Sequence, residues 1–239
     1  ALPLGGRQAR REGVVANNGH SIAFPFDFSG QQVFALGSAP ESFPPPAGSG
    51  AWSVVTVNGS QAILERLGLR TPPVTTLMNR SILKSSIRSG IAARSVLRGS
   101  STENLVVVSH KVSPKQRLLI ACRLWWLRYR YRSLTVLDMR HRSRIMAGLL
   151  GDAYDERTPP SNGIFVALLA LHLGASRVLM SGFSLSRAGH AYNDLNLPRG
   201  HLDGDTLALR RIVALGLPVF TNDERFARES GLPLMSGAA

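Results

Sequence analysis

Short runs of apolar residues recur along the chain from Val33, and each is separated from the next by a more polar stretch. The runs cover residues 33–36, 53–57, 74–78, 105–109, 134–139, 177–182 and 217–220. Most are apolar at nearly every position rather than at alternate positions, which is typical of strands buried on both faces of a sheet. The pattern therefore predicts a parallel sheet that is covered by helices on both sides.

The stretches between these runs have helical character. We expect helices over residues 61–67, 84–98, 114–131, 142–150, 161–173, 203–215 and 222–230. Strands that alternate with helices predict an α/β, Rossmann-like doubly wound fold with a mainly parallel sheet. In such sheets, ligands bind at the carboxyl ends of the strands, near the point where the strand order reverses. The residues that follow each strand are therefore the first candidates for chemistry.

The length of 239 residues is enough for one large domain. Residues 1–30 are polar and rich in glycine, so we expect a loosely ordered segment there and a single domain over residues 31–239. The N-terminus lacks the apolar core of a signal peptide, although an upstream segment could have been removed. No run reaches the roughly 18 apolar residues of a membrane-spanning helix. Cys122 is the only cysteine, which excludes an internal disulfide framework and a cysteine-based zinc site.

The formal net charge of +13 favours anionic partners. The charge is concentrated in one region, because ten lysines and arginines but one acid, Asp138, lie between Lys111 and Arg144. Within it, residues 113–133 combine arginines with Trp125 and Trp126. A basic helix with aromatic residues can lie on an anionic membrane surface or bind nucleic acid. A solvated helix with a buried aromatic face is the plain alternative.

Polar residues follow the first three predicted strands. Gly37 and Ser38 come after the first strand, where a glycine lets the backbone approach a ligand, although an ordinary tight turn would look the same. Asn58 and Ser60 follow the second strand and Asn79 follows the third. An Asx turn with Ser60 as a helix cap explains the second pair equally well. Two asparagines at successive strand ends favour a ligand site more than either does alone.

Residues 157–175 contain the strongest helix-start signal in the chain. Two prolines lead into Ser161, Asn162 and Gly163, and a long apolar helix follows. Free N–H groups at such a terminus attract an anion such as phosphate, although a capped core helix needs no ligand. After the next strand comes a long polar, glycine-rich loop that carries two histidines and Tyr192, and a loop of this kind often acts as a lid.

The ordered set of these segments resembles bacterial sialyltransferases of the capsule and lipooligosaccharide type, and related CMP-sugar transferases. The matching stretches are ALGSAPES, TVNGSQAIL, TLMNRS, PPSNGIFVALLALHLGASRVLMSGFSL, AGHAY and GHLDGDTLALRRIVALGLPVFTND, which together span about Val33 to Leu234. The resemblance implies an inverting, metal-independent glycosyltransferase with no cofactor, whose donor is a CMP-activated acidic sugar, sialic acid or Kdo. It also implies lipopolysaccharide or capsule biosynthesis, with a surface glycan or glycolipid as acceptor.

The resemblance assigns roles to particular residues. It makes His201 the general base and Tyr192 a hydroxyl donor to the leaving phosphate. It makes a set of further residues nucleotide-binding: Gly37, Ser38, Asn58, Ser60, Asn79, Ser161, Asn162 and Gly163. The family carries a second tyrosine where this chain has Ser186, so we expect His190 or Arg187 to contact the phosphate instead. The loop is also shorter than in the family, which leaves the donor and the acceptor open.

The chemistry of transfer is compatible with these roles. An imidazole titrates near neutral pH and can take the acceptor proton. Donors fixed around the phosphate stabilise the charge that develops on the leaving CMP. Asp203 and Asp205 form a DxD sequence, which holds a metal in many nucleotide-sugar transferases. We interpret them instead as acids in the first turn of a helix, where the helix dipole favours them.

Three functions remain open from the sequence. The first is the CMP-sugar glycosyltransferase, peripheral to the inner face of the cell membrane in the cytoplasm and bound to anionic lipid through Ser113–Ser133. The second is a nucleic-acid-binding α/β protein, which the charge favours but which lacks RNP, KH, zinc-finger and Walker signatures. The third is a non-catalytic module that keeps the nucleotide pocket. An oligomer is compatible with all three.

Overall fold

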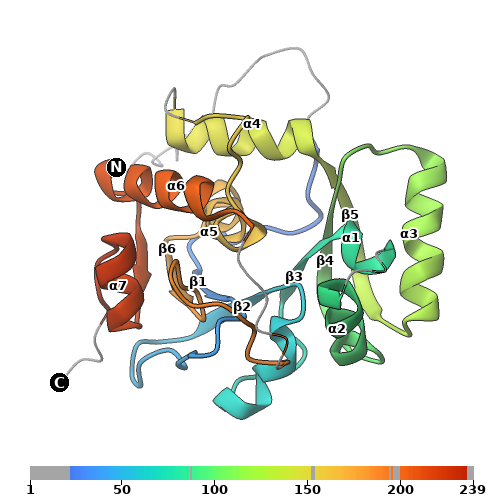
Figure 1. Ribbon diagram of the computed structural model, residues 1–239, viewed down its shortest axis with the longest axis horizontal. Coiled ribbons are helices and arrows are strands. Elements are labelled where there is room, and N and C mark those ends of the chain that lie inside the picture. The colour runs from blue at the N-terminus through green and yellow to red at the C-terminus, as the bar shows by residue number, and fades with distance from the viewer. Residues whose placement is uncertain are drawn as a thin grey trace, which may run out of the picture.

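A computed structural model describes residues 22–84, 86, 88–151, 154–193, 195 and 200–235. All strands of this part form one sheet in which every neighbouring pair is parallel, in the order β5-β4-β3-β2-β1-β6-β7 (Figure 1). The strands are β1 (Gln32–Leu36), β2 (Trp52–Val57), β3 (Thr75–Asn79), β4 (Ser101–Ser109), β5 (Arg130–Asp138), β6 (Arg177–Ser181) and β7 (Val219–Thr221). This confirms the predicted α/β doubly wound class.

The strand order reverses between β1 and β6. Strands β1 to β5 add one after another toward one edge of the sheet, whereas β6 returns to pair with β1 and β7 extends that side. The register pairs Leu36 with Thr56 on one side and with Ser181 on the other. The loops that follow β1 and β6 therefore leave the same edge of the sheet side by side, where a doubly wound fold places its ligand.

Helices cover both faces of the sheet. They are η1 (Ser60–Ile63), η2 (Glu65–Leu67), α1 (Arg80–Lys84), α2 (Arg88–Leu97), α3 (Pro114–Trp126), α4 (Met139–Leu150), α5 (Asn162–His172), α6 (Leu202–Ala214) and α7 (Glu224–Ser230). Figure 1 shows α4, α5 and α6 together, and α3 at the end of the molecule beside β5. Along a strand, Val33 and Ala35 pack into the core under α5, whereas Phe34 and Leu36 pack with η1 on the opposite face. This explains why the central parts of most strands are apolar at nearly every position.

The predicted helix over residues 114–131 is wrong beyond Trp126. Arg128 adopts a left-handed backbone with φ of 55°, which a helix cannot continue. Tyr129 then turns into the core, where its hydroxyl donates to Oε1 of Gln61 at 2.5 Å. Strand β5 begins at the next residue, Arg130. The basic region is therefore a helix, a turn and an edge strand rather than one continuous helix.

Two other helix boundaries differ from expectation. The predicted helix over residues 61–67 is a pair of short 3-10 turns, η1 and η2. The predicted helix over residues 84–98 corresponds to α2, and α1 is a separate short helix before it that overlaps the prediction only at Lys84. Of the expected N-terminal segment 1–30, residues 1–21 lie outside the described part. Within residues 22–30, Phe28 is buried in the core, and its N–H donates to the carbonyl of Leu173 at 2.8 Å.

Candidate functional site

The main cleft of the described chain lies at the carboxyl edge of the sheet and has a volume of about 890 Å³. Its walls come from the loops after β1, β2, β3, β4 and β6 and from the first turns of α2, α5 and α6. The predicted site residues that line it are Gly37, Ser38, Asn58, Asn79, Ser161, Asn162, Gly163, His190, Tyr192 and His201. Segments distant in the sequence thus meet at the switch point between β1 and β6.

The loops after β1 and β6 pass so closely that side chains cannot fit between them. A Cβ on Gly37 would lie 2.2 Å from the carbonyl oxygen of Gly182, and one on Gly182 would lie 2.9 Å from the carbonyl oxygen of Gly37. The N–H of Gly37 donates to the carbonyl of Ser181 at 2.8 Å. Gly182 also has φ of +75°, which favours glycine. Internal packing therefore requires Gly37, whether or not a ligand approaches it.

Phe183 extends this contact to the start of α5. A Cβ on Gly163 would lie 2.7 Å from the ring of Phe183, and the same ring lies 2.8 Å from the Cβ position of Gly37. We refer to Gly37, Gly163, Gly182 and Phe183 as the β1–β6 junction. The junction fixes the N-terminus of α5 against the carboxyl end of β1, with the Phe183 ring packed between Gly37 and Gly163.

Asn58 and Asn79 both organise the backbone at the strand ends. Oδ1 of Asn58 accepts the N–H of Asn79 at 3.1 Å, and Oδ1 of Asn79 accepts the N–H of Ser81 at 2.8 Å. Asn58 has φ of 54°, a conformation that asparagine tolerates better than most residues. Because the carbonyl oxygens are used in this way, the side-chain amide N–H groups are the ones left to donate to a ligand in the cleft.

The start of α5 is held by α6 rather than by its own cap. Ser161 occupies the N-cap position without a side-chain hydrogen bond. Its N–H instead donates to Oδ1 of Asp205 in the first turn of α6, at 2.5 Å. A Cβ on Gly204 would lie 2.7 Å from the carbonyl oxygens of Thr158 and Pro159. The GHLDGD segment therefore docks on the TPPSNG segment, and Ser161, Asn162 and Gly163 at the start of α5 line the cleft.

Asp203 and Asp205 both lie in the first turn of α6, as expected. The carboxylate of Asp205 is buried and accepts the N–H of Ser161. Among the described residues, no three His, Cys, Asp or Glu side chains gather in a way that could hold a metal ion.

Arg142 supports the same corner from α4. Its side chain is buried, with the guanidinium 5.0 Å from the ring centroid of Phe165 and one nitrogen donating to the carbonyl of Pro160. Burial lowers the pKa of Arg142, and the nearby Tyr154 and Asp205 offset part of that effect. Nε of Arg142 has no hydrogen-bond partner among the described residues. A buried positive charge thus lies directly behind the prolines that lead into α5.

His201 occupies the N-cap position of α6 and lines the cleft. Its side chain is exposed and does not cap the helix. Its backbone carbonyl accepts the N–H of Asp205 at 2.9 Å, so the residue is anchored through its main chain. The imidazole is therefore placed at the mouth of the cleft by structure that does not depend on the ring.

Ser38, His190 and Tyr192 form a cluster across the cleft from α2. Oγ of Ser38 lies 2.8 Å from Nδ1 of His190, and the rings of His190 and Tyr192 stack with centroids 5.2 Å apart and an interplanar angle of 10°. Tyr192 also lies over Gly59, where a Cβ would come within 2.7 Å of the ring. Burial raises the pKa of Tyr192 to about 12, against a smaller lowering by a hydrogen bond with Ser38. The Tyr192 hydroxyl therefore stays protonated at physiological pH and can donate a hydrogen bond.

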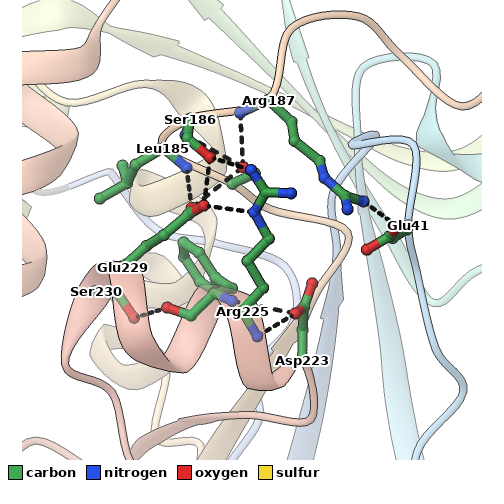
Figure 2. Close-up of polar contacts among 10 residues, drawn as sticks. Glu41, Leu185, Ser186, Arg187, Asp223, Arg225, Glu229 and Ser230 are labelled. Atoms are coloured by element: carbon green, nitrogen blue, oxygen red, sulfur yellow. Dashed lines mark hydrogen bonds and ion pairs between the residues drawn. The ribbon is translucent and has the colours of Figure 1, made fainter.

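Two predicted site residues lie outside the cleft. Ser60 is fully buried, and its hydroxyl donates to the carbonyl of Leu36 at 2.7 Å and accepts the N–H of Val57 at 2.8 Å. Ser60 therefore fastens the turn after β2 to β1 and does not cap η1. Arg187 forms an ion pair with Glu41, as Figure 2 shows.

Ser186, which stands where the resembling family has its second tyrosine, also lies outside the cleft. Figure 2 shows it in a network around Glu229 of α7. The Glu229 carboxylate accepts the Ser186 hydroxyl, the N–H of Leu185 at 2.7 Å, Nε of Arg225 at 3.0 Å and the Ser184 hydroxyl at 3.1 Å. Burial alone would raise the pKa of Glu229, but these hydrogen bonds outweigh it and lower the pKa to about 2. The network fixes the start of the loop that carries His190 and Tyr192.

The charge of the cleft suits an anion. Its lining includes Arg88, His110 and Arg142 in addition to His190 and His201. The one carboxylate among the described lining residues is that of Asp205, which is already engaged with Ser161.

Several cleft residues were missed from the sequence. His110 follows β4 directly, so the rule of inspecting each strand end would have found it. Arg88, Ser89 and Gly90 at the start of α2 and the buried Arg142 have no local signal, because only the tertiary fold brings them to the cleft.

Comparison with known proteins was informative at the level of structure. No family model matches the sequence, and no curated protein matches it. The sialyltransferase CstII from Campylobacter jejuni, solved with the substrate analogue CMP-3FNeuAc, is similar with a TM-score of 0.53 and 12% identity, over 85% of this chain and 86% of that one. The monofunctional alpha-2,3-sialyltransferase Cst-I from the same organism is similar with a TM-score of 0.54 and 10% identity, over 91% of this chain and 83% of that one. The chain thus has the fold of these sialyltransferases, as the resemblance predicted.

Within the described residues, no helix is long and apolar enough to cross a membrane.

Proposed function

We propose that this protein is an inverting glycosyltransferase that moves an acidic sugar, sialic acid or Kdo, from a CMP-activated donor to a glycan or glycolipid acceptor. The observation that carries the proposal is the cleft at the β1–β6 switch point. Its described lining combines amide, hydroxyl and cationic groups with one carboxylate, that of Asp205, which is hydrogen-bonded to Ser161. The cleft lies in the fold that known CMP-binding sialyltransferases share. A CMP-sugar with an acidic sugar carries two negative charges, which such a cleft suits.

The nucleotide is bound in this proposal by the strand ends and by α5. The amides of Asn58 and Asn79 donate to the nucleotide, with Gly37 and Ser38 beside it. The N–H groups of Asn162 and Gly163 attract an anionic group through the helix dipole, and Ser161, whose own N–H is held by Asp205, offers its hydroxyl. The buried Arg142 adds positive charge behind this terminus. Ser60 is left out of the binding set because both of its hydrogen bonds are internal.

The transfer step uses His201, Tyr192 and His190. The acceptor hydroxyl attacks the anomeric carbon, and His201 takes its proton as the new C–O bond forms. The bond from the anomeric carbon to the phosphate oxygen breaks, and the electron pair leaves with CMP. Tyr192 donates a hydrogen bond to that phosphate. His190 is the second donor, because Ser38 orients its ring in the cleft whereas Ser186 and Arg187 face Glu229 and Glu41. This chemistry requires no metal ion and no cofactor.

The acceptor class sets the expected location. A lipopolysaccharide or capsule precursor is built at the inner face of the cell membrane, so we propose a cytoplasmic protein that is peripheral to an anionic membrane.

The proposed activity is tested by incubating the purified protein with CMP-sialic acid and, separately, with CMP-Kdo, and measuring the release of CMP with and without a lipooligosaccharide acceptor. We expect acceptor-dependent release with one donor, unchanged by EDTA. Loss of release in EDTA that manganese restores would overturn the metal-free mechanism. CMP binding without any turnover on either donor would favour the non-catalytic module instead.

A further inference from the structure

Helix α3 is apolar on both of its sides. Ile120 and Leu124 face the core and are buried. The opposite side carries Leu118, Leu119, Cys122, Trp125 and Trp126, which we call the α3 outer face. Leu118 is 66% exposed, Trp125 75% and Trp126 73%. A helix on the surface of a globular protein normally presents polar residues to water. We therefore expect a binding partner to cover this apolar face.

The residues of the α3 outer face are adjacent on the helix surface. Leu118, Cys122 and Trp125 follow an i, i+4, i+7 spacing, which aligns side chains along one side of a helix. The rings of Trp125 and Trp126 meet edge to face with centroids 5.9 Å apart. Figure 1 shows α3 at the outer end of the molecule beside β5, the edge strand of the sheet. The face therefore lies on the outside of the molecule, where a large partner could reach it.

The charge around this face is of one sign. Between Glu103 and Asp138 the chain contains seven lysines and arginines and no acid. Lys115 and Arg117 are exposed on α3 itself, and Arg128, Arg130 and Arg132 are exposed just beyond it. A tryptophan ring at a polar–apolar boundary and arginines that reach anionic headgroups are the features of proteins that lie on membrane surfaces.

We propose that the α3 outer face is a membrane-binding surface that inserts Trp125, Trp126 and Leu118 into the interface of an anionic bilayer. Two other occupants fit less well. A second copy of the chain would bring arginine-rich surfaces together without an acid to balance them. Single-stranded nucleic acid binds in basic grooves that have stacking platforms, whereas this face includes two exposed leucines and lines none of the clefts found among the described residues. The proposal stands independently of the transfer reaction, because it concerns binding of lipid and not the cleft.

The test is co-sedimentation of the full chain with vesicles of phosphatidylcholine alone and of an equal mixture of phosphatidylcholine and phosphatidylglycerol. We expect binding to the anionic vesicles that weakens as salt rises from about 0.1 M to about 1 M, where the Debye length falls from about 10 Å to about 3 Å. Tryptophan emission should shift to shorter wavelength on binding, since Trp125 and Trp126 leave water.

Two pairs of variants separate the apolar and the electrostatic contributions. Trp125→Ala with Trp126→Ala should lower the partition coefficient by at least about tenfold. Lys115→Glu with Arg117→Glu should lower it by at least about 25-fold, because each basic residue near the surface contributes about fivefold. The matched controls are Leu207→Ala with Leu215→Ala, exposed leucines in α6 and at its C-cap, and Arg66→Glu with Arg70→Glu, exposed arginines in η2 and just beyond it. Both controls should bind like the wild type.

Three results would overturn the proposal. The first is absence of binding to anionic vesicles, or binding that the two tryptophan substitutions do not change. The second is a dimer in sedimentation equilibrium that these substitutions dissociate, which would assign the face to a second copy. The third is tight, salt-sensitive binding of an oligonucleotide that is lost with the Lys115 and Arg117 substitutions while no vesicle binds. None of these measurements depends on activity, so they leave the proposed reaction to its own test.

Discussion

The β1–β6 junction and the α3 outer face differ in how their side chains are packed: the junction has no room for a further atom, whereas the outer face is exposed. At the junction, Gly37 and Gly182 bring two loops into backbone contact, and Phe183 fills the remaining space. At the outer face, two tryptophans and two leucines are exposed on a helix, and the two tryptophan rings contact each other. The residue types at the junction are dictated by close packing within the fold, and the junction forms the wall of a pocket for a small ligand. The outer face contributes little to the fold and is suited to a large external surface.

The largest expected effect concerns the cleft next to the junction. His201→Ala should lower the turnover number by about 10²–10⁴-fold, which is the range for loss of a general base. The fold should survive, because the His201 side chain is exposed and makes no cap. Steady-state kinetics and CMP binding are the measurements, with His172→Gln at the far end of α5 as the control. Wild-type turnover in His201→Ala would exclude this residue as the base.

The junction itself should be intolerant of a single methyl group. Gly37→Ala places a Cβ 2.2 Å from the Gly182 carbonyl oxygen, and we expect it to lower the free energy of unfolding by about 3 kcal/mol. Gly148→Ala is the matched control, since that glycine lies within α4 with nothing within 4 Å of the Cβ position. It should raise the free energy of unfolding by about 0.5–1 kcal/mol. Urea denaturation measures both, and equal stability of the two variants would contradict the packing argument.

The Glu229 network should show a pH-dependent contribution. Because the pKa of Glu229 is lowered from 4.5 to about 2, its stabilisation is present above about pH 5 and is lost as the pH falls toward 2. Glu229→Gln should therefore cost at most about 3 kcal/mol of unfolding free energy at pH 7, and the difference from the wild type should shrink between pH 5 and pH 2.

Urea denaturation across this pH range measures the Glu229 effect. Glu224→Gln, which removes an exposed ion pair with Arg228, is the control and should change little at any pH. A wild-type minus Glu229→Gln difference that grows in acid would show that the sign is wrong.

The smallest expected effect is at the α3 outer face. Trp126→Ala should change the free energy of unfolding by no more than about 0.5 kcal/mol, because the side chain is 73% exposed. A cost comparable to that of Gly37→Ala would show that the ring packs on the fold in solution, and would remove the contrast between the two regions.

The fold followed from the sequence because its strands are buried on both faces. That burial makes each strand nearly continuous in apolar residues, and the strand ends then indicated where ligand-binding residues should be sought. Asn58, Asn79, Tyr192 and His201 were found in this way or through the resemblance, and all four line the cleft.

The errors share one cause, which is dependence on contacts between distant segments. The helix predicted to continue to residue 131 ends early because Tyr129 is drawn into the core beside Gln61. The packing roles of Gly37 and Gly163 were missed, because Gly182 and Phe183, which leave no room for a side chain there, are distant in the sequence. Ser60 looked like a helix cap, but its partner is Leu36 on another strand. No local pattern reveals a partner that is far away in the sequence.

The central claim is that the cleft at the β1–β6 switch point binds CMP through Asn58 and Asn79, and calorimetry tests it most directly. The wild type should bind CMP in preference to UDP and to a short oligonucleotide. Asn58→Ala and Asn79→Ala should each weaken CMP binding by about 0.5–3 kcal/mol, with the upper part of the range applying if the partner is a charged phosphate. Trp126→Ala should leave it unchanged. Unaltered CMP affinity in both asparagine variants, or binding of the oligonucleotide in place of CMP, would contradict the account.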